Sequence, residues 1–231
     1  MFDSFLEAAP GVLQIRSLFG SAVNCYLVND VLIDAGLPWE SRRLARLLRG
    51  CKLRAHALTH AHPDHMGGTR RICTEAEIPL FCGKRDVNAA ESGRMALTTK
   101  NKVWVPPQMF VLPTEGQRVT RVLKEGDDVA GFTVLETPGH TLGHLSFFRE
   151  KDRVLICGDV MMGMSFLTFR AGIYKPFGPF SYDMHLNYES AKRLAALRPN
   201  VVCFGHGPVL KDPSKLDRLR AAASETSAFE D

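Results

Sequence analysis

The sequence has no C-x-x-C pair, no long apolar run and no stretch of concentrated positive charge. Its six cysteines are scattered, and most lie among apolar residues, so we expect buried free thiols in a reducing compartment. No stretch approaches the roughly 20 apolar residues that a membrane-spanning helix needs. The first ten residues lack the basic flank and apolar centre of a signal peptide. We therefore expect a cytoplasmic protein that has no membrane partner.

An excess of charge of one sign is also absent. Lysine and arginine total 29 against 25 aspartate and glutamate residues, which gives a net charge of +4. The weak charge and the lack of a basic run argue against nucleic acid as a partner. The 231 residues, 45% of them hydrophobic, are typical of a globular chain. We expect a single domain over residues 1–231.

The order of apolar segments predicts an α+β fold. Residues 11–18 and 22–33 are rich in β-branched and aliphatic side chains, broken at Gly20-Ser21 and Asn29-Asp30 as at hairpin turns. Further strands are predicted at residues 55–58, 78–81, 119–123, 132–136, 145–149, 153–157 and 201–204. Helices are predicted at residues 38–50, 67–77, 85–92 and 183–197, and from Asp212 through Leu216, Leu219 and Ala223; residues 98–107 are expected to be loop. This order favours two packed sheets covered by helices.

Four residues of one short segment have the side chains that metal ions prefer: His60, His62, Asp64 and His65. The segment follows a short apolar strand and precedes Gly67-Gly68, so it is expected to lie on a loop at a strand end. In extended chain His60 and His62 point the same way and can bind one ion. Asp64 and His65, past the turn at Pro63, can address a second ion. The chain has only eight histidines, which makes a chance polar loop a weak explanation.

Three residues elsewhere share this setting. His140, Asp159 and His206 each follow an apolar strand, and a glycine precedes each of them. Glycine permits a tight turn and a close approach of the backbone. Together with the histidine segment, these residues lie at the ends of four predicted strands. They form a consistent set of candidate metal ligands.

The order H-x-H-x-D-H, Gly-His, Gly-Asp and Gly-His-Gly resembles the metallo-β-lactamase-fold hydrolase superfamily, in particular its glyoxalase II-like branch. Leu32–Gly36 also matches the family's first motif, and the likeness runs from about residue 12 to residue 208. The resemblance implies an α+β fold, a four-layered αββα sandwich of two mixed β-sheets flanked by helices. It also implies two divalent metal ions, with Zn preferred and Fe or Mn as alternatives.

Carried onto this sequence, the resemblance assigns three ligands to a first ion: His60, His62 and His140. It assigns three more to a second ion: Asp64, His65 and His206. Asp159 would bridge the two ions, and it shares with Asp64 a catalytic role in anchoring charge and moving a proton. Asp34 would orient ligands without touching metal, and His144 would brace the loop around His140. His56 and His185 match no motif and are expected in a strand and in a helix.

The chemistry that the resemblance implies is hydrolysis of an ester, a lactone or a thioester in a small molecule. A hydroxide bound between the two metal ions would be the nucleophile. The sequence ends 25 residues after His206, which leaves no room for the helical glutathione-binding domain of glyoxalase II. Phosphodiesterase and promiscuous β-lactamase activity are alternatives. Another is a mononuclear iron dioxygenase that acts on a persulfide and uses only ligands of the His60, His140 and Asp159 type.

Residues 161–182 are rich in methionine and aromatic side chains, with glycine and proline among them. The segment is too irregular for one amphipathic helix, so we expect an apolar loop beside the metal site. One interpretation is a lid or pocket wall for an apolar acyl or ring substrate. The candidate lining residues are Met164, Phe166, Tyr174, Phe177 and Tyr182. Packing into the core or into a homodimer contact is the equally weighted alternative.

Overall fold

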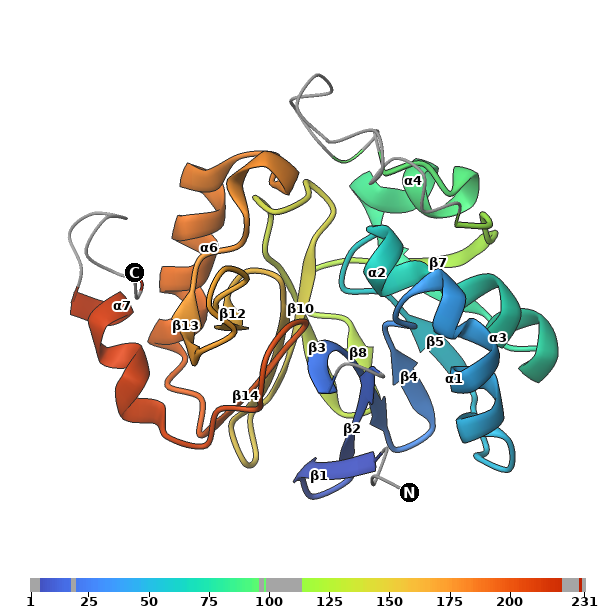
Figure 1. Cartoon of the computed structure of the whole chain (residues 1–231), viewed down its shortest axis with the longest axis horizontal. Helices are drawn as coiled ribbons and strands as arrows, with labels where there is room; N and C mark the ends of the chain where they lie inside the picture. Colours follow the sequence, from blue (N-terminus) through green and yellow to red (C-terminus); the bar gives the residue numbers. More distant parts are fainter. Residues whose placement is uncertain (1–4, 18–19, 96–97, 99–113, 222–228, 230–231) are drawn as a thin grey trace.

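The computed structural model describes residues 5–17, 20–95, 98, 114–221 and 229. These residues form two β-sheets that pack face to face, with helices on both outer surfaces (Figure 1). Among them, no helix combines the length and the apolar character needed to cross a bilayer.

The first sheet contains seven strands that follow one another in chain order. They are β1 (Phe5–Ala9), β2 (Val12–Ser17), β3 (Gly20–Val28), β4 (Val31–Ile33), β5 (Ala55–Ala57), β6 (Leu80–Gly83) and β7 (Val119–Leu123). The first four strands pair antiparallel. The strands from β4 to β7 pair in parallel, which requires long crossover connections between them. The sheet is therefore mixed.

The second sheet contains five strands in the order β14-β11-β10-β9-β8. Their bounds are β8 (Asp128–Val129), β9 (Phe132–Glu136), β10 (Leu145–Arg149), β11 (Val154–Gly158) and β14 (Val201–Phe204). Only β11 and β14 pair in parallel; the other pairs are antiparallel. A separate two-stranded hairpin joins β12 (Met162–Met164) to β13 (Ala171–Tyr174).

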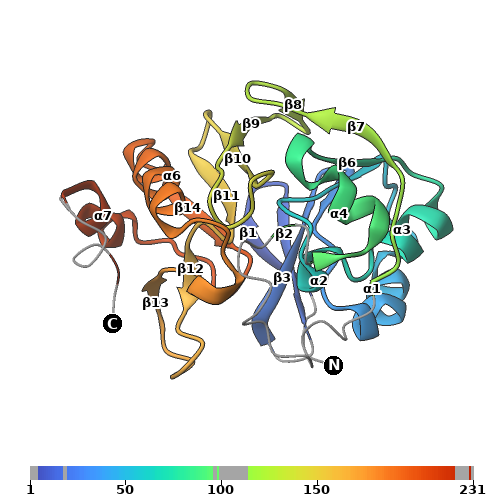
Figure 2. The ribbon, with the colours of Figure 1, turned by 90° about the horizontal axis from the view of Figure 1, so that it is seen from above.

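Helices cover the outer face of each sheet (Figure 2). The first sheet is covered by α1 (Ser41–Leu48), α3 (Thr69–Ala76) and α4 (Val87–Ser92), and the second by α6 (Met184–Ala196) and α7 (Asp217–Ala221). One-turn elements complete the described chain: η1 (Pro38–Glu40), α2 (Pro63–Met66), η2 (Lys84–Asp86), η4 (Gly178–Phe180) and η5 (Pro213–Leu216). The predicted four-layered αββα sandwich is confirmed.

Alternate residues of the central strands belong to different layers because successive side chains of a strand point to opposite faces. On β11, Val154 and Ile156 pack between the sheets, whereas Leu155 packs toward α6. On β4, Ile33 faces the space between the sheets and Leu32 faces the helices. Strands buried on both faces read as continuous apolar runs, which explains why the sequence indicates them clearly.

Some sequence predictions were wrong. The predicted turn at Gly20-Ser21 lies inside β3, and the predicted strand at 78–81 begins two residues later, at Leu80. The strand β1 was not predicted, since its sequence FLEAA contains no β-branched residue and the strand forms by pairing with β2. The short helix α2 was not predicted either. Ala223 and most of residues 98–107 lie outside the described residues.

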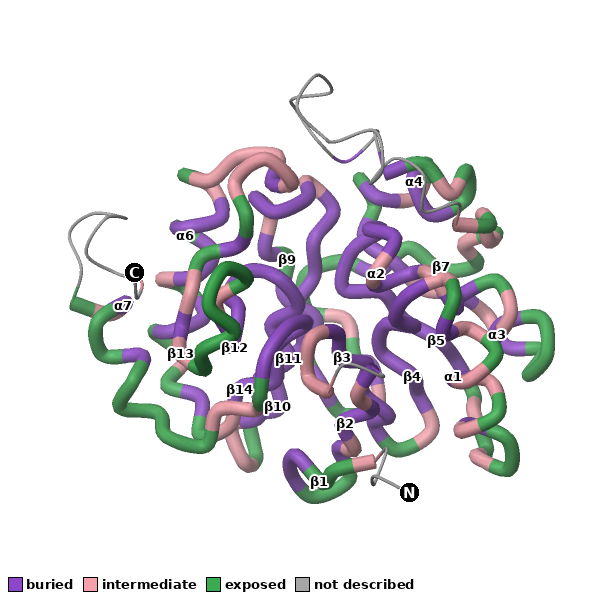
Figure 3. The backbone as a smooth tube through the Cα atoms, viewed as in Figure 1, coloured by how far each residue is buried: buried purple, intermediate pink, exposed green. Residues whose placement is uncertain are grey.

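The segment 161–182 is not a plain loop. It contains the hairpin of β12 and β13, because Met162 pairs with Tyr174 and Met164 with Ala171. Met161 and Ile173 are buried in the core beneath α6. The tip between the two strands is exposed (Figure 3), with Leu167 90% and Phe169 72% accessible. The segment therefore divides into a core part and an exposed apolar tip.

Candidate metal centre

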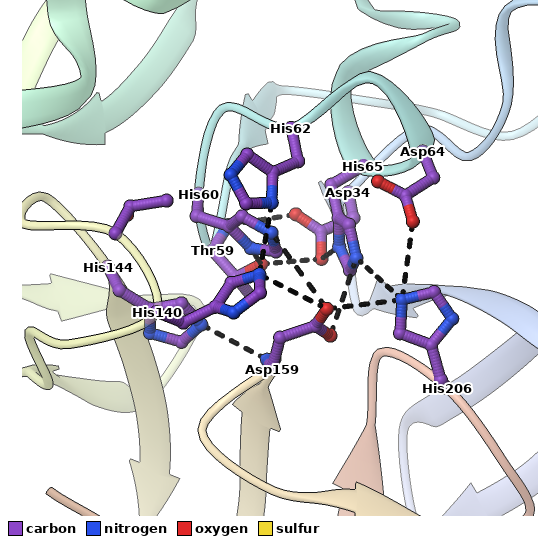
Figure 4. A network of polar contacts seen from close by, with 12 residues as sticks. Asp34, Thr59, His60, His62, Asp64, His65, His140, His144, Asp159 and His206 are labelled. Carbon is purple, nitrogen blue, oxygen red and sulfur yellow. Dashed lines mark hydrogen bonds and ion pairs between the residues drawn. The ribbon is translucent and has the colours of Figure 1, made fainter. Parts of the chain in front are cut away.

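Four loops meet at one edge of the sandwich, and each follows the carboxyl end of a strand: β5, β9, β11 or β14. They carry seven candidate ligands that point toward one another (Figure 4): His60, His62, Asp64, His65, His140, Asp159 and His206. All except Asp64 are almost fully buried. The fold thus gathers residues from distant parts of the chain into one cluster.

His60, His62 and His140 form the first group, with one nitrogen of each ring within 4.8 Å of the others. The Nδ1 atom of His62 lies 3.0 Å from the Nε2 atom of His140. Burial lowers the pKa of His62 to about 4, and it lowers the pKa values of His60 and His140 well below the ordinary value. The group therefore presents three neutral imidazoles, which is the form that binds a metal ion.

Asp64, His65 and His206 form the second group, again with ligand atoms within 4.8 Å. The Nε2 atom of His206 lies 3.3 Å from Asp64 Oδ2 and 3.4 Å from His65 Nε2. Burial would lower the pKa of His65, but Asp159 and Asp34 outweigh it and raise that pKa well above the ordinary value. Without a cation, this group holds protons in the place of a metal ion.

Asp159 lies between the two groups. Its carboxylate is 3.1 Å from His206 Nε2 and 3.4 Å from His65 Nε2. On the other side it is 3.5 Å from His140 Nε2 and 4.0 Å from His60 Nε2. Burial would raise the pKa of Asp159, but the positive charge of His206 and His65 holds it well below the ordinary value. The carboxylate is ionised and placed to contact cations in both groups.

The hydrogen bonding of the cluster is incomplete. Three of its buried polar atoms have no hydrogen-bond partner: His60 Nε2, His62 Nε2 and Asp159 Oδ1. Buried polar atoms normally have partners, so each such atom calls for an explanation. The imidazole of His60 and the carboxylate of Asp159, which carry two of these atoms, face the centre of the cluster (Figure 4). The donor set of imidazole nitrogens and carboxylate oxygens fits divalent metal ions.

Asp34 supports the cluster from the end of β4. Its carboxylate accepts hydrogen bonds from the backbone and the hydroxyl of Thr59, each at 2.8 Å. It also lies 2.8 Å from His65 Nδ1, which leaves the Nε2 atom of that ring to face the cluster. Asp34 has a φ of 59°, a conformation that non-glycine residues rarely adopt and that Asp and Asn tolerate best.

His144 holds the loops of two ligands. Its Nε2 atom accepts a hydrogen bond from the backbone N–H of Asp159 at 3.1 Å, and its Nδ1 atom lies 2.9 Å from Thr137 Oγ1 at the start of the His140 loop. Gly158 has a φ of 53°, and a Cβ atom there would lie 2.6 Å from the His144 ring. Glycine is therefore required where this ring packs against the Asp159 loop.

Several supporting residues were missed by sequence reasoning. Ser181 Oγ lies 3.0 Å from His140 Nδ1. Asp86 accepts hydrogen bonds from Ala61 N, Thr141 Oγ1 and Gly143 N, so it ties the His60–His65 loop to the His140 loop. The only sequence signal for Asp86 is an acidic residue shortly after an apolar strand.

The His206 loop is held by the first sheet. The side-chain amide of Asn24, on β3, donates hydrogen bonds to the carbonyl oxygens of Phe204 and Gly207, and Tyr26 also donates to that of Phe204. The Nδ1 atom of His206 contacts the carbonyl oxygen of Ala22. These contacts join residues about 180 positions apart, and no sequence pattern indicated them.

The candidate pocket residues lie around this edge in different ways. The ring of Phe166 is 5.1 Å from the ring of His206, and Met164 is buried where β12 passes the His206 loop. Tyr174 pairs with β12, and Phe177 is half exposed and packs on the ring of Phe180. Tyr182 donates its backbone N–H to the carbonyl oxygen of His140. The structure thus places Phe166 and Tyr182 next to ligand residues.

Comparison with known proteins agrees with this geometry. A model of the metallo-beta-lactamase superfamily matches residues 18–206. The probable metallo-hydrolase YflN of Bacillus subtilis is 30% identical, over 87% of this chain and 85% of its own. A hydroxyacylglutathione hydrolase of Bdellovibrio bacteriovorus is 28% identical, and the match spans 72% of this chain but 55% of that protein.

Solved structures show the same fold. The di-iron-bound form of TTHA1623 superposes with a TM-score of 0.66 at 29% identity, over 89% of this chain and 96% of its own. The B3 metallo-beta-lactamase BLEG-1 superposes with a TM-score of 0.67 at 25% identity, over 87% of this chain and 95% of its own.

Proposed function

Since the chain belongs to the metallo-β-lactamase superfamily and is a metal-dependent hydrolase, we propose that it uses two divalent ions to cleave a carboxylic ester, a lactone or a thioester. Zinc is the proposed metal, because imidazole and carboxylate ligands suit it. We also propose that residues 1–231 act as one domain, since the family match includes strands of both sheets.

One observation carries the proposal: the ionised carboxylate of Asp159 lies between two complete ligand groups. In the proposed arrangement, His60, His62 and His140 hold one ion. Asp64, His65 and His206 hold the other, and Asp159 contacts both. Asp34 and His144 orient ligands through the contacts described above. The pairing of ligand groups favours two ions over the single iron of a persulfide dioxygenase, which would leave the second group without metal.

Two bound ions would polarise the substrate's carbonyl oxygen and supply a hydroxide nucleophile at neutral pH. In this proposal, side chains of the protein carry the proton to the leaving group. Asp64 is the one ligand carboxylate with substantial exposure, its side chain being 30% accessible, and its Oδ2 atom lies next to His206 Nε2. Asp64 is therefore placed to carry a proton from the buried cluster to a departing alkoxide or thiolate at the open side.

The relatives bear on the substrate class. The name hydroxyacylglutathione hydrolase denotes an enzyme that cleaves a thioester. The similarity to such a protein supports thioester and ester substrates for this chain. The exposed apolar tip beside His206 supports a substrate with an apolar part. We propose Met164, Phe166, Tyr174, Phe177 and Tyr182 as the residues that border this part of the substrate.

The test combines metal analysis with a substrate panel. The purified protein is analysed for Zn, Fe and Mn and assayed with a lactone, a thioester, a phosphodiester and a β-lactam, before and after chelation. We expect two ions per chain and a chelator-sensitive rate with the lactone or the thioester. One iron per chain, together with oxygen uptake on a persulfide, would overturn the proposal. A rate confined to the phosphodiester would also overturn the proposed substrate class.

A further inference from the structure

We propose that the substrate carries a carboxylate, and that a basic pocket between α4 and the segment before α6 binds this group while the scissile carbonyl lies at the metal centre. The inference rests on the proposed function and deepens it, because it names a substrate class and the side chains that select it. The selecting residues are Lys84 and Arg85.

A cavity of about 540 Å³ lies at this place. Lys84 and Arg85 border it from η2, Asn88 from the first turn of α4, and Leu142 and Tyr182 from the opposite side. Figure 1 shows α4 and the start of α6 along the same edge of the sandwich. The volume is within the range of small-molecule sites.

The cavity adjoins the metal centre through the backbone. Tyr182, in its wall, donates its backbone N–H to the carbonyl oxygen of His140 at 2.9 Å. Leu142 lies two residues beyond His140 on the same loop. Asp86, also in the wall, binds the N–H of Ala61, which lies between two candidate ligands. The cavity therefore lies beside the loops that carry His60, His62 and His140, and in the proposed arrangement the scissile carbonyl lies on the metal side of these loops.

The charges that face the cavity are unbalanced. Within the described part of the chain, the side chains of Lys84 and Arg85 make no hydrogen bond or ion pair, and both are exposed. Asp86 is the acidic residue that borders the cavity, and its two oxygens are already engaged by Ala61, Thr141 and Gly143. Asp183, next to Tyr182, is engaged in capping α6. Two cations without acidic partners beside a cavity attract an anion.

Other cavities do not fit this role. A cavity of about 450 Å³ lies between α1 and α3, where Arg49 and Lys52 border it together with Glu75, and no residue of a ligand-bearing loop borders it. A third, of about 310 Å³, contains Glu75 and Glu115 beside its arginines. Of these three cavities, only the one bordered by Lys84 and Arg85 combines cations that have no acidic partner among the described residues with a residue of a ligand-bearing loop, Leu142.

A carboxylate suits this pocket better than a larger anion. Two separate cations and the amide of Asn88 can share the two oxygens of one carboxylate. The substrate would then lie with its carboxylate toward α4, and its apolar part would extend toward Phe166 and His206. The two ends of the site would differ in polarity, which fixes the direction in which the substrate binds.

The experiment uses matched thioesters that differ only in charge. S-acetyl mercaptoalkanoic acids of two to six methylenes are compared with their neutral carboxamides, and a second series carries the same groups on the acyl side. Thiol release gives kcat/KM for the metal-loaded protein and for the variant Lys84→Met/Arg85→Met. The control is Lys151→Met/Arg198→Met, which makes the same charge change near the turn between β10 and β11, at the end of these strands opposite to the metal centre.

We expect at least one carboxylate to be hydrolysed about tenfold faster than its carboxamide, an effect typical of one or two exposed ion pairs. The preference should disappear in the Lys84/Arg85 variant, persist in the control, and shrink as salt screens the charges. Rates on the carboxamides are the reference within each protein, and the Lys151/Arg198 control should match the wild-type protein on them within about twofold. Equal rates on every acid and amide pair in the wild-type protein would overturn the inference and leave the proposed hydrolase function intact.

A binding measurement separates the two proposals if no thioester is cleaved. Calorimetry with adipate, and with inorganic phosphate as a second anion, is performed on the wild-type protein and both variants. Weaker adipate binding in the Lys84/Arg85 variant alone supports the pocket even when the hydrolase proposal fails. Unchanged adipate binding refutes it. If the protein binds phosphate more tightly than adipate, and this preference depends on Lys84 and Arg85, the pocket selects a phosphate group and the carboxylate proposal is overturned.

Discussion

The Nε2 atom of His206 lies 3.1 Å from the Oδ2 atom of Asp159, inside the buried cluster. Burial would lower the pKa of His206, but Asp159 and Asp64 outweigh burial and raise it to about 10. Burial lowers the pKa of His62, in the other ligand group, to about 4. Without metal, the two groups therefore hold opposite protonation states at neutral pH, one cationic and one neutral.

This difference predicts that the two metal ions bind with different pH dependence. An ion at the second group must displace protons from both His206 and His65, whose pKa values are raised above the ordinary value. Its affinity should therefore rise at least about tenfold per pH unit between pH 6 and pH 8, below the His206 pKa of about 10. Affinity at the first group should stay nearly flat over this range, which lies above the pKa of His62. Competition with a chromophoric chelator at pH 6, 7 and 8 measures both constants. Equal slopes for the two ions would contradict the prediction.

Asp159→Asn tests the carboxylate that lies between the groups. The change keeps the shape of the side chain but removes the charge that faces four histidines. We expect at least one ion per chain to be lost and kcat/KM to fall about a hundredfold or more. This loss is larger than that expected from changing a residue that only orients a ligand. Metal analysis and steady-state kinetics measure both effects. Asp152→Asn, at the turn between β10 and β11, is the control and should keep both ions.

The ligands could be predicted from the sequence because each stands directly after a strand whose apolar run marks it. His140, Asp159 and His206 follow β9, β11 and β14 within a few residues. The contacts that hold these loops could not be predicted. Asp86 binds groups 25 to 57 residues away, and Asn24 binds carbonyl groups about 180 residues away. Such contacts arise only when the two sheets pack.

The conformation of the exposed apolar tip between β12 and β13 could not be predicted from the sequence either. Its composition predicted apolar residues beside the metal site, but composition alone gave no pairing. The hairpin forms because Met162 pairs with Tyr174, while Ser165 Oγ accepts hydrogen bonds from Leu167 N and Thr168 N at the turn. The turn that presents the tip therefore depends on hydrogen bonds between the Ser165 side chain and the backbone, which an irregular sequence pattern does not reveal.

The substitution Asp34→Asn tests whether the Asp34 carboxylate orients His65, without adding backbone strain at this position. Asparagine tolerates the φ of 59° as well as aspartate does, so the fold should be kept. The charge that holds His65 Nδ1 at 2.8 Å is lost. We expect affinity for the second ion to fall about 10- to 100-fold while the first ion is unaffected. Chelator competition measures the change, and equal weakening of both ions would argue against an orienting role.

Asp86→Asn tests the buried carboxylate that joins the two ligand loops. Burial raises the pKa of Asp86 to about 6, although bonds from Ala61, Thr141 and Gly143 oppose the shift. Because the folded pKa exceeds the unfolded one, this group stabilises the fold below about pH 4. That contribution, about 3 kcal/mol for a shift of roughly two units, is lost as the pH rises through 6.

Asparagine does not titrate in this range. The free energy of unfolding of the variant minus that of the wild-type protein should therefore increase by about 3 kcal/mol from pH 4 to pH 7. Its stability at pH 4 should be lower than wild type, because an amide cannot accept all three hydrogen bonds. Denaturant unfolding at both pH values measures the difference. A difference that does not change with pH would show that Asp86 keeps an ordinary pKa in the fold.

Phe166→Ala tests whether the exposed tip contacts the substrate. The ring of Phe166 lies 5.1 Å from that of His206 and is 44% accessible, so its outer face is free to cover an apolar group. Losing that contact should lower kcat/KM for an apolar acyl ester about tenfold, mainly through KM, since partial burial of a phenyl ring is worth roughly 1.5 kcal/mol. The metal content should not change, because Phe166 supplies no ligand atom. Val122→Ala, which trims an exposed residue of β7, is the control. A loss of kcat and of metal together would mean that Phe166 supports the His206 loop instead of the substrate.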